Sequence, residues 1–391
     1  MARSRRFPWI ILAAACLLVA CSGGGNRAAT TTTAPAYPRD GQLRLNQIQA
    51  LGTHNSYHVE PVPKVMSTLR SFDASFADSI EYSHPPLVTQ FGTQGIRQVE
   101  LDVWSDPAGG HYAHPRLPAI LKLDEPVVPA MEHPGFKVFH MQDVDYRSNC
   151  PTLANCLQSI RQWSDAHPGH VPIMVLIEAK ASPINIGADL GWTPPLPIGP
   201  TELDALDAEI RSVFDANRLI TPDDVRGNHD TLEEAVTTDG WPTLAEARGK
   251  VLFTLDNEDA IRTAYLKGHP SLRGRVLFTS SQPGQPSAAF VKLNDPVKDG
   301  QRIRQLVAKG YIVRTRTDAD TKEARTGDTK MRDAAIRSGA QWVSTDYPVP
   351  DPIFDTGYVV RLPGGEPARC NPVSAPASCR ASDIENPDHL G

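Results

Sequence analysis

The sequence predicts an α/β protein built on a closed (β/α)₈ barrel of the TIM type. Eight short apolar runs recur along the chain, and segments with helical periodicity lie between several of them. Strands that alternate with helices are typical of parallel βαβ units, and eight strands over about 300 residues fit a closed barrel better than an open doubly wound sheet. The predicted strands are residues 46–53, 96–104, 137–141, 171–178, 250–256, 275–279, 311–315 and 341–346.

Four segments between these strands are predicted to be helices. The second has a Thr-x-x-Asp cap that begins at Thr201, and the last two end at Gly310 and Gly339, which are good C-terminal stops. No Gly-x-Gly-x-x-Gly follows the first strand, which weakens the alternative of a dinucleotide-binding sheet. The four segments are residues 151–167, 201–214, 301–309 and 329–338.

The run at 96–104 alternates apolar residues with Glu100 and Asp102. Because strand side chains have a period of two, both carboxylates lie on one face, about 7 Å apart. Such a pair suits a hard divalent cation, which prefers oxygen ligands. The same alternation also fits a half-exposed edge strand with two solvated acids, and this run by itself does not decide between the two.

Polar residues gather at the carboxyl ends of the other predicted strands. In a barrel of this kind that is the end where catalytic residues collect, so their joint placement indicates an active site. The remaining loop histidines, His84, His111, His114 and His133, are expected to be solvated. The strand-end residues are His54, Asn55, Glu100, Asp102, His140, Glu178, Lys180, Asp256, Arg314, Arg316 and Asp346.

The composition is that of an ordinary soluble globular protein, with 40% apolar and 21% charged residues among 391. The formal charge of −6 argues against nucleic acid as a partner, because nucleic-acid binding requires a basic face. No obligate protein partner is evident in the sequence.

The N-terminus has the pattern of a targeting signal. Arg3, Arg5 and Arg6 precede an apolar run at 9–20 that is too short to span a bilayer. The run ends Leu18-Val-Ala-Cys21 and resembles a bacterial lipoprotein signal, in which Cys21 would carry lipid; an ordinary secretory signal is the alternative. We therefore expect a signal peptide at 1–20, a lipidated cysteine and flexible tether at 21–43, and an exported protein anchored outside the cytoplasmic membrane or on the cell surface.

Export places the remaining cysteines in an oxidising compartment. Four cysteines remain after Cys16 and Cys21, and they allow three pairings. Local closure, Cys150 with Cys156 and Cys370 with Cys379, is the economical pairing, and neither pair has the spacing of a zinc site. The second pair lies in residues 351–391, which we expect to form a short C-terminal extension.

Several motifs in order along the chain resemble phosphatidylinositol-specific phospholipases C, most closely the bacterial calcium-dependent branch. They include Thr53-His-Asn-Ser-Tyr57, Val99-Glu-Leu-Asp-Val-Trp104, the later His140 and the strand that carries Glu178. The stretches 136–140, 163–167, 314–318 and 343–348 also look like that branch. The resemblance covers roughly residues 44–350 and implies a TIM-type barrel, regular or distorted, and Ca²⁺ as the metal.

The resemblance also implies roles for individual residues. His54 would stabilise the pentacovalent phosphorus or act as base, and His140 would protonate the glycerol oxygen. Lys180 is a candidate phosphate or inositol contact, while Arg314, Arg316, Asp256 and Asp346 are either inositol or supporting residues or structural ion pairs. Glu100 or Glu178 is an alternative base. The implied Ca²⁺ ligands are Asn55, Glu100, Asp102 and Glu178.

The implied reaction cleaves phosphatidylinositol to diacylglycerol and an inositol phosphate, by attack of the inositol 2-hydroxyl on phosphorus. Three alternatives stay open at this point. They are a glycerophosphodiester phosphodiesterase that acts on soluble substrates, a sphingomyelinase-like phosphodiesterase, and a catalytically silent inositide-binding lipoprotein.

Overall fold

The structure is a computed structural model and describes residues 37–386 and 390. The predicted signal peptide, the lipidated Cys21 and most of the tether lie outside the described residues. Within the part described, no helix combines the length and the apolar character that crossing a bilayer requires.

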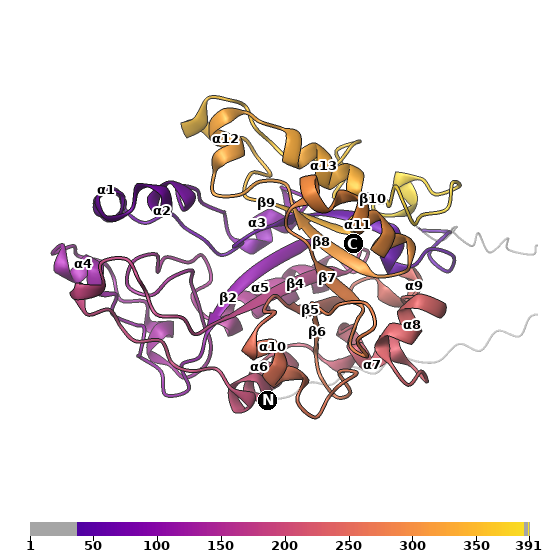
Figure 1. Ribbon diagram of the computed structural model, residues 1–391, viewed down its shortest axis with the longest axis horizontal. Helices are drawn as coiled ribbons and strands as arrows, with labels where there is room; N and C mark the ends of the chain where they lie inside the picture. Colours follow the sequence, from indigo (N-terminus) through magenta and orange to yellow (C-terminus); the bar gives the residue numbers. More distant parts are fainter. Residues whose placement is uncertain (1–36, 387–389, 391) are drawn as a thin grey trace, which may run out of the picture. The chain divides into compact units, whose positions relative to one another are not determined.

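Eight parallel strands form a nearly closed barrel, which confirms the predicted fold class (Figure 1). Around the barrel they run in the order β6-β5-β4-β2-β1-β9-β8-β7, and a parallel bridge from Ser280 to Phe290 joins the two ends of this path. The strands are β1 (Ile48–Thr53), β2 (Gln98–Trp104), β4 (Ile173–Lys180), β5 (Val251–Leu255), β6 (Leu277–Thr279), β7 (Phe290–Lys292), β8 (Ile312–Arg316) and β9 (Trp342–Thr345).

The barrel is irregular between β1 and β2, which share the single parallel pair Gly52 and Gln98. A Cβ atom at Gly52 would lie 2.1 Å from the Gln98 side chain, so this close approach requires glycine. Beside this seam the short strand β10 (Ala368–Cys370) pairs antiparallel with β1.

One predicted barrel strand is wrong and one was missed. Residues 137–141 contribute only β3 (Lys137–Val138), which pairs antiparallel with the end of β2. A parallel return needs a substantial crossover, usually a helix, whereas the chain between β2 and β3 has only one short α-helix. The eighth barrel strand is instead β7, whose three residues are too few to show a strand period.

Helices follow most of the strands and cover the barrel (Figure 1). The four predicted helices correspond to α5, α6, α11 and α13, but α6 begins at Pro200 with Gly199 as its cap, so the predicted Thr201 cap is wrong. The α-helices are α1 (Pro63–Phe72), α2 (Ala74–Ser79), α3 (Leu87–Gly92), α4 (Arg116–Ile120), α5 (Leu153–Ala166), α6 (Pro200–Val213), α7 (Pro222–Arg226), α8 (Leu232–Thr238), α9 (Leu244–Ala247), α10 (Ala260–Leu266), α11 (Pro296–Ala308), α12 (Lys322–Thr326) and α13 (Lys330–Ser338).

The strand β2 lies between β4 and β1 and is buried on both faces. The half-exposed edge strand is therefore excluded as an explanation of its two acids. Parallel register places Asp102 beside Glu178 of β4, and side chains at paired positions point to the same side of a sheet. Register alone thus brings two carboxylates from different strands together.

The two disulfides are the local pairs predicted from the sequence. Cys150 bonds to Cys156, and Cys370 bonds to Cys379. The first closes the loop that leads into α5, and the second begins in β10.

A second apolar cluster covers one side of the barrel mouth. It is formed by α1, α2, α4 and residues 184–192, and includes Leu69, Ala77, Leu117 and Ile184. Asp143 fixes this region, because its carboxylate accepts hydrogen bonds from the backbone of Arg116 and of Thr193 at 2.9 and 2.5 Å.

Candidate active site

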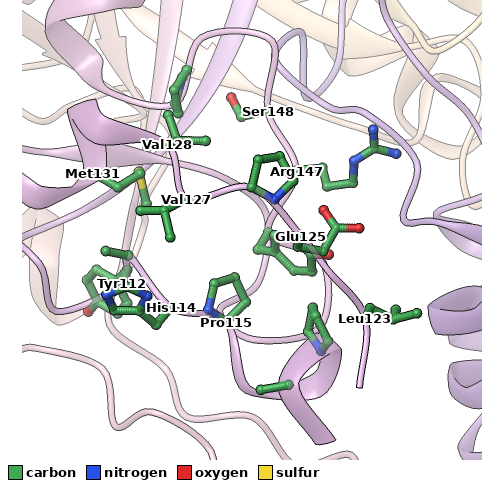
Figure 2. Close-up of a pocket in the computed structure, with 16 residues that line it drawn as sticks. Tyr112, His114, Pro115, Leu123, Glu125, Val127, Val128, Met131, Arg147 and Ser148 are labelled. Carbon is green, nitrogen blue, oxygen red and sulfur yellow. The ribbon is translucent and has the colours of Figure 1, made fainter. Parts of the chain in front are cut away.

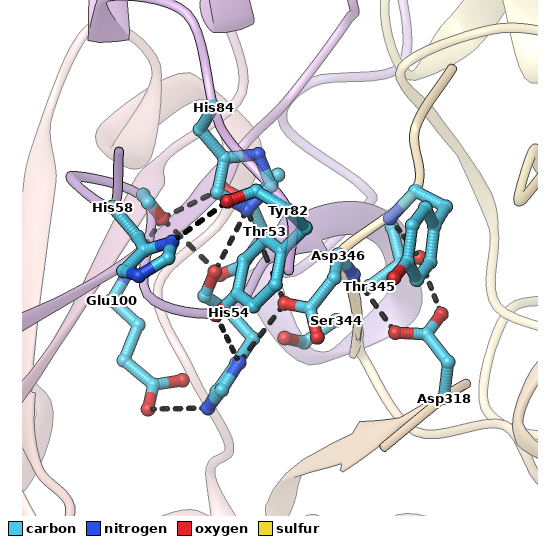
Figure 3. Close-up of polar contacts among 12 residues, drawn as sticks. Thr53, His54, His58, Tyr82, His84, Glu100, Asp318, Ser344, Thr345 and Asp346 are labelled. Carbon is cyan, nitrogen blue, oxygen red and sulfur yellow. Dashed lines mark hydrogen bonds and ion pairs between the residues drawn. The ribbon is translucent and has the colours of Figure 1, made fainter. Parts of the chain in front are cut away.

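Polar side chains from β1, β2, β8 and β9 meet at the carboxyl ends of these strands (Figure 3). At the centre is His54, which directly follows β1. Its Nδ1 donates to Oδ1 of Asp346 at 2.9 Å, and its Nε2 lies 3.9 Å from Oε1 of Glu100 and 3.3 Å from Nη1 of Arg316. A carboxylate can only accept a hydrogen bond, so the proton of neutral His54 is on Nδ1, which faces Asp346. The other ring nitrogen, Nε2, then carries the free lone pair.

Burial and neighbouring cations keep His54 neutral. Burial lowers the pKa of His54 well below its usual value, and the charges of Arg316 and Arg314 lower it further. A neutral imidazole with a carboxylate on one nitrogen can accept a proton on the other.

Three carboxylates from β2 and β4 form a compact acidic cluster. Oxygen atoms of Glu100, Asp102 and Glu178 all lie within 4.8 Å of one another. Burial raises the pKa of Asp102 well above its usual value and that of Glu100 to about 7, although Arg314 opposes the shift at Glu100. A cation bound among these carboxylates would favour their charged forms.

The donor atoms of this cluster fit Ca²⁺. Oδ1 of Asp102 and Oδ1 of Asn55 are buried without a hydrogen-bond partner among the described residues, which leaves them available as ligands, while Oδ2 of Asp102 lies beside the Lys180 ammonium. Asn55 has a φ of 43°, a strained backbone conformation that also occurs at binding sites. Carboxylate and amide oxygens are the ligands that Ca²⁺ prefers.

Lys180 lies among the acids of this cluster. Its Nζ is 3.2 Å from Oδ2 of Asp102 and 3.1 Å from Oε1 of Glu178. The ammonium therefore neutralises part of the cluster in the absence of another cation.

The other predicted cations also have carboxylate partners. Arg314 is buried and pairs with Glu100, while Nη2 of Arg316 lies 3.2 Å from Oδ2 of Asp346. Asp256, which follows β5, pairs with Lys292 of β7 at 2.6 Å. Arg316 also contacts His54, through Nη1 at 3.3 Å from Nε2.

His140 is oriented in the same way as His54, by a different carboxylate. Its Nδ1 donates to Oδ2 of Asp145 at 2.8 Å. Asp145 also contacts Nε2 of His58 at 3.0 Å through each of its oxygens. His54 and His140 are near enough for the charge of His140 to lower the pKa of His54.

The sequence prediction missed His58, Asp145 and Asp318, all of them buried. Asp318 accepts from the backbone N of Asp346 at 2.8 Å and so holds the partner of His54 in place. Asp145 could have been found from its position five residues after His140, and Asp318 from its place at the end of the 314–318 stretch, whereas nothing in the sequence marks His58.

The prediction that His84 is solvated is wrong. Its side chain is buried, and Nε2 donates to the carbonyl oxygen of His54 at 3.0 Å (Figure 3). His114 and His133 are exposed, and His111 is half-buried, with Nε2 donating to Pro194 O.

A separate cavity of about 550 Å³ lies outside this site (Figure 2). Its walls are largely apolar, with Val127, Val128 and Met131 among them, and Glu125 and Arg147 supply charge. None of the predicted site residues lines it, so the acidic cluster with its two histidines remains the candidate active site.

Comparison with known proteins agrees with this geometry. The model of the family described as "Phosphoinositide phospholipase C, Ca2+-dependent" matches residues 43–372. A calcium-dependent phosphoinositol-specific phospholipase C from Pseudomonas sp. is 18% identical, with a TM-score of 0.50, over 86% of this chain and 99% of that one. A Ca²⁺-dependent enzyme from Streptomyces antibioticus is 21% identical, with a TM-score of 0.47, over 78% and 95% of the two chains. No curated protein matches the sequence.

Proposed function

We propose a reaction for this chain on the premise that it belongs to the Ca²⁺-dependent phosphoinositide phospholipase C family, whose model matches residues 43–372. The chain is thus an enzyme of the phosphatidylinositol-specific phospholipase C class. The proposed reaction is Ca²⁺-dependent cleavage of phosphatidylinositol into diacylglycerol and an inositol phosphate. One observation carries it: His54 and His140, each oriented at Nδ1 by its own buried carboxylate, accompany a compact cluster of three carboxylates, and the neighbouring Asn55 Oδ1 is buried without a donor.

Asn55, Glu100, Asp102 and Glu178 would hold the Ca²⁺. When bound there, Ca²⁺ supplies positive charge that favours ionisation of the attacking hydroxyl and neutralises phosphate oxygens. Arg316 adds fixed positive charge beside His54, where a non-bridging phosphate oxygen would accept a hydrogen bond.

In the first step the inositol 2-hydroxyl attacks phosphorus. A bond forms between its oxygen and phosphorus, and Nε2 of His54 takes its proton. We assign this role to His54 instead of Glu100 because the Glu100 carboxylate is paired with Arg314 and belongs to the acidic cluster, whereas Asp346 orients His54 as an acceptor.

In the same step the bond from phosphorus to the glycerol oxygen breaks. His140 donates the proton from Nε2 to that oxygen, while Asp145 holds Nδ1. The products are diacylglycerol and an inositol cyclic phosphate, which water can open to the acyclic phosphate with the two histidines in reversed roles.

A phospholipid substrate agrees with the predicted location of the protein. An exported chain anchored through Cys21 would be held close to lipid. A tether of about 20 residues has a root-mean-square reach of roughly 25 Å, so docking onto the anchoring membrane is feasible but not required.

The test is turnover of phosphatidylinositol, phosphatidylcholine, sphingomyelin and glycerophosphoinositol, each with Ca²⁺ and with chelator. We expect cleavage of phosphatidylinositol that chelator abolishes and added Ca²⁺ restores. Cleavage of glycerophosphoinositol alone would identify a soluble-substrate phosphodiesterase, and a rate unaffected by chelator would remove the Ca²⁺ assignment.

A further inference from the structure

His58 is a fully buried histidine whose two ring nitrogens both face acceptors. Nδ1 lies 3.0 Å from the carbonyl oxygen of Tyr82, and Nε2 lies 3.0 Å from both carboxylate oxygens of Asp145. A carbonyl oxygen and a carboxylate can only accept, so both nitrogens of His58 must carry protons. The ring is therefore an imidazolium ion enclosed in the protein.

The charge of Asp145 sustains this state. Burial by itself would lower the pKa of His58, but the charge and hydrogen bonds of Asp145 outweigh it and raise the pKa overall. Burial correspondingly opposes ionisation of Asp145, whose pKa His58 and His140 nonetheless lower to about 2. The two residues form a buried ion pair.

Asp145 cannot turn away from this pair easily. Its backbone N–H donates to Met141 O at 3.0 Å, and its carbonyl oxygen accepts from Met141 N at 3.0 Å. The short loop between these residues carries His140 at one end and Asp145 at the other. Oδ2 of the Asp145 carboxylate also accepts from Nδ1 of His140.

We infer that His58 is a positioning residue for His140, which it controls by holding Asp145 in the orientation that takes the Nδ1 proton of His140. This inference rests on the proposed function, in which His140 protonates the leaving oxygen. Nothing in the sequence motifs or in the proposed roles assigns His58 to the reaction.

His58 also contacts the surroundings of the other histidine. It anchors the carbonyl of Tyr82, whose hydroxyl approaches Nδ1 of His54 at 3.4 Å, and its own carbonyl accepts from the backbone N of His84 at 2.9 Å. The ring of His58 lies between the segment of His140 and the segment of Tyr82. Loss of His58 should nevertheless affect acid catalysis most, because Asp145 is its only carboxylate partner among the described residues.

An ion pair between His58 and Asp145 that only stabilises the fold would have the same geometry as one that positions His140. The two roles can be separated by comparing substrates with different leaving groups. The glycerol oxygen of phosphatidylinositol is a poor leaving group that needs a proton. A 4-nitrophenyl leaving group departs as a stable anion and needs none. A defect in positioning His140 should therefore be specific to the lipid substrate.

The experiment measures kcat and KM of His58→Phe and His58→Gln on phosphatidylinositol and on inositol 1-(4-nitrophenyl phosphate), with saturating Ca²⁺. We expect kcat on the lipid to fall about 100-fold, at the lower end of what general acid catalysis contributes. On the nitrophenyl ester kcat should change less than about fivefold, with KM for both substrates close to that of the wild type. Asp145→Asn should show the same selectivity.

His170→Gln is the matched control, because His170 is another fully buried histidine, bonded to Ser164 and Val171. Its kcat on both substrates should stay at the wild-type value. Equal loss on both substrates in the His58 variants, or wild-type turnover of the lipid, would overturn the inference.

A spectroscopic measurement on the wild-type protein covers the case in which the variants do not fold. In ¹⁵N-histidine-labelled enzyme we expect two protonated nitrogens on His58 and a proton on Nδ1 of His140, which faces Asp145. A bare nitrogen on His58, or a bare Nδ1 on His140, refutes the arrangement. If wild-type enzyme cleaves neither substrate, the proposed function fails, while the ¹⁵N spectrum still decides whether His58 holds Asp145 and His140.

Discussion

Nδ1 of His54 donates to Oδ1 of Asp346 at 2.9 Å, across a sequence separation of 292 residues. The pair forms because β1 and β9 are neighbours in the barrel, with Thr53 opposite Thr345, so the residues that follow the two strands meet at one rim.

Asp346→Asn should lower kcat on phosphatidylinositol by about 100- to 1,000-fold, because an amide does not enforce the Nδ1–H tautomer of His54. Ca²⁺ affinity should change little, since Asp346 lies outside the acidic cluster. Initial rates and titration calorimetry check both expectations. Asp207→Asn, at a buried carboxylate that accepts from Tyr265, is the control and should retain activity. Wild-type kcat in Asp346→Asn would exclude His54 as an oriented base.

Asp102→Asn should lower Ca²⁺ affinity at least about 100-fold, because it removes a charged ligand from the centre of the cluster. Calorimetry and the shift of the melting temperature on adding Ca²⁺ both measure this loss without relying on activity. Asp106→Asn is a close control, since Asp106 is also buried but pairs with Lys137. Equal Ca²⁺ affinity in the two variants would place the ion elsewhere.

Lys180→Met should increase Ca²⁺ affinity about tenfold or more, because the lysine ammonium competes for Asp102 and Glu178. The melting temperature without Ca²⁺ should fall, since two carboxylates lose their counter-charge. Thermal unfolding in chelator and calorimetry with Ca²⁺ test the two effects separately. Unchanged Ca²⁺ affinity together with a raised KM would instead support the phosphate contact predicted from the sequence.

Stability should fall as the pH drops from 7 to 5, in part because of His170. Burial lowers the pKa of His170 to about 4, so the unfolded chain, with a pKa near 6.5, binds the proton first. This contribution to stability is complete above pH 6.5 and declines toward pH 4. It amounts to about 2 kcal/mol between pH 7 and 5. Urea unfolding should show that the free energy of unfolding falls less between pH 7 and 5 in His170→Gln than in the wild type. His133→Gln, at an exposed position, is the control and should show the same fall as the wild type.

Gly52→Ala should destabilise the fold by about 1–3 kcal/mol, since the added Cβ overlaps Gln98 at the only pair between β1 and β2. Gly300→Ala is the control, because a Cβ at Gly300 in α11 meets nothing within 4 Å. Alanine there should stabilise the helix by about 0.5–1 kcal/mol. Denaturant unfolding compares the two variants. Equal stabilities would show that Gln98 moves to accommodate the added Cβ between β1 and β2.

Prediction from the sequence worked where local pattern and structure share a cause. The alternation at 96–104 is a strand whose apolar residues are buried, and Glu178 lies near the carboxyl end of a strand, as the sequence predicts. It failed at 137–141, where an equally apolar run pairs antiparallel with β2. The apolar composition of a segment does not indicate whether it pairs parallel or antiparallel with its neighbour, because this depends on the path of the connecting loop.

The sequence by itself determined the barrel class, from strands and helices that alternate along the chain. It also determined the local disulfides and the strand-end acids and histidines, which depend on spacing within a few residues. Only the tertiary structure decided that Asp346 holds His54, that Asp145 joins His140 to His58, and that Lys180 lies among the acids. Those contacts depend on which strands become neighbours and which way each loop turns. The physical reason is that a buried charge needs a partner, and the whole fold, not the nearby sequence, supplies it.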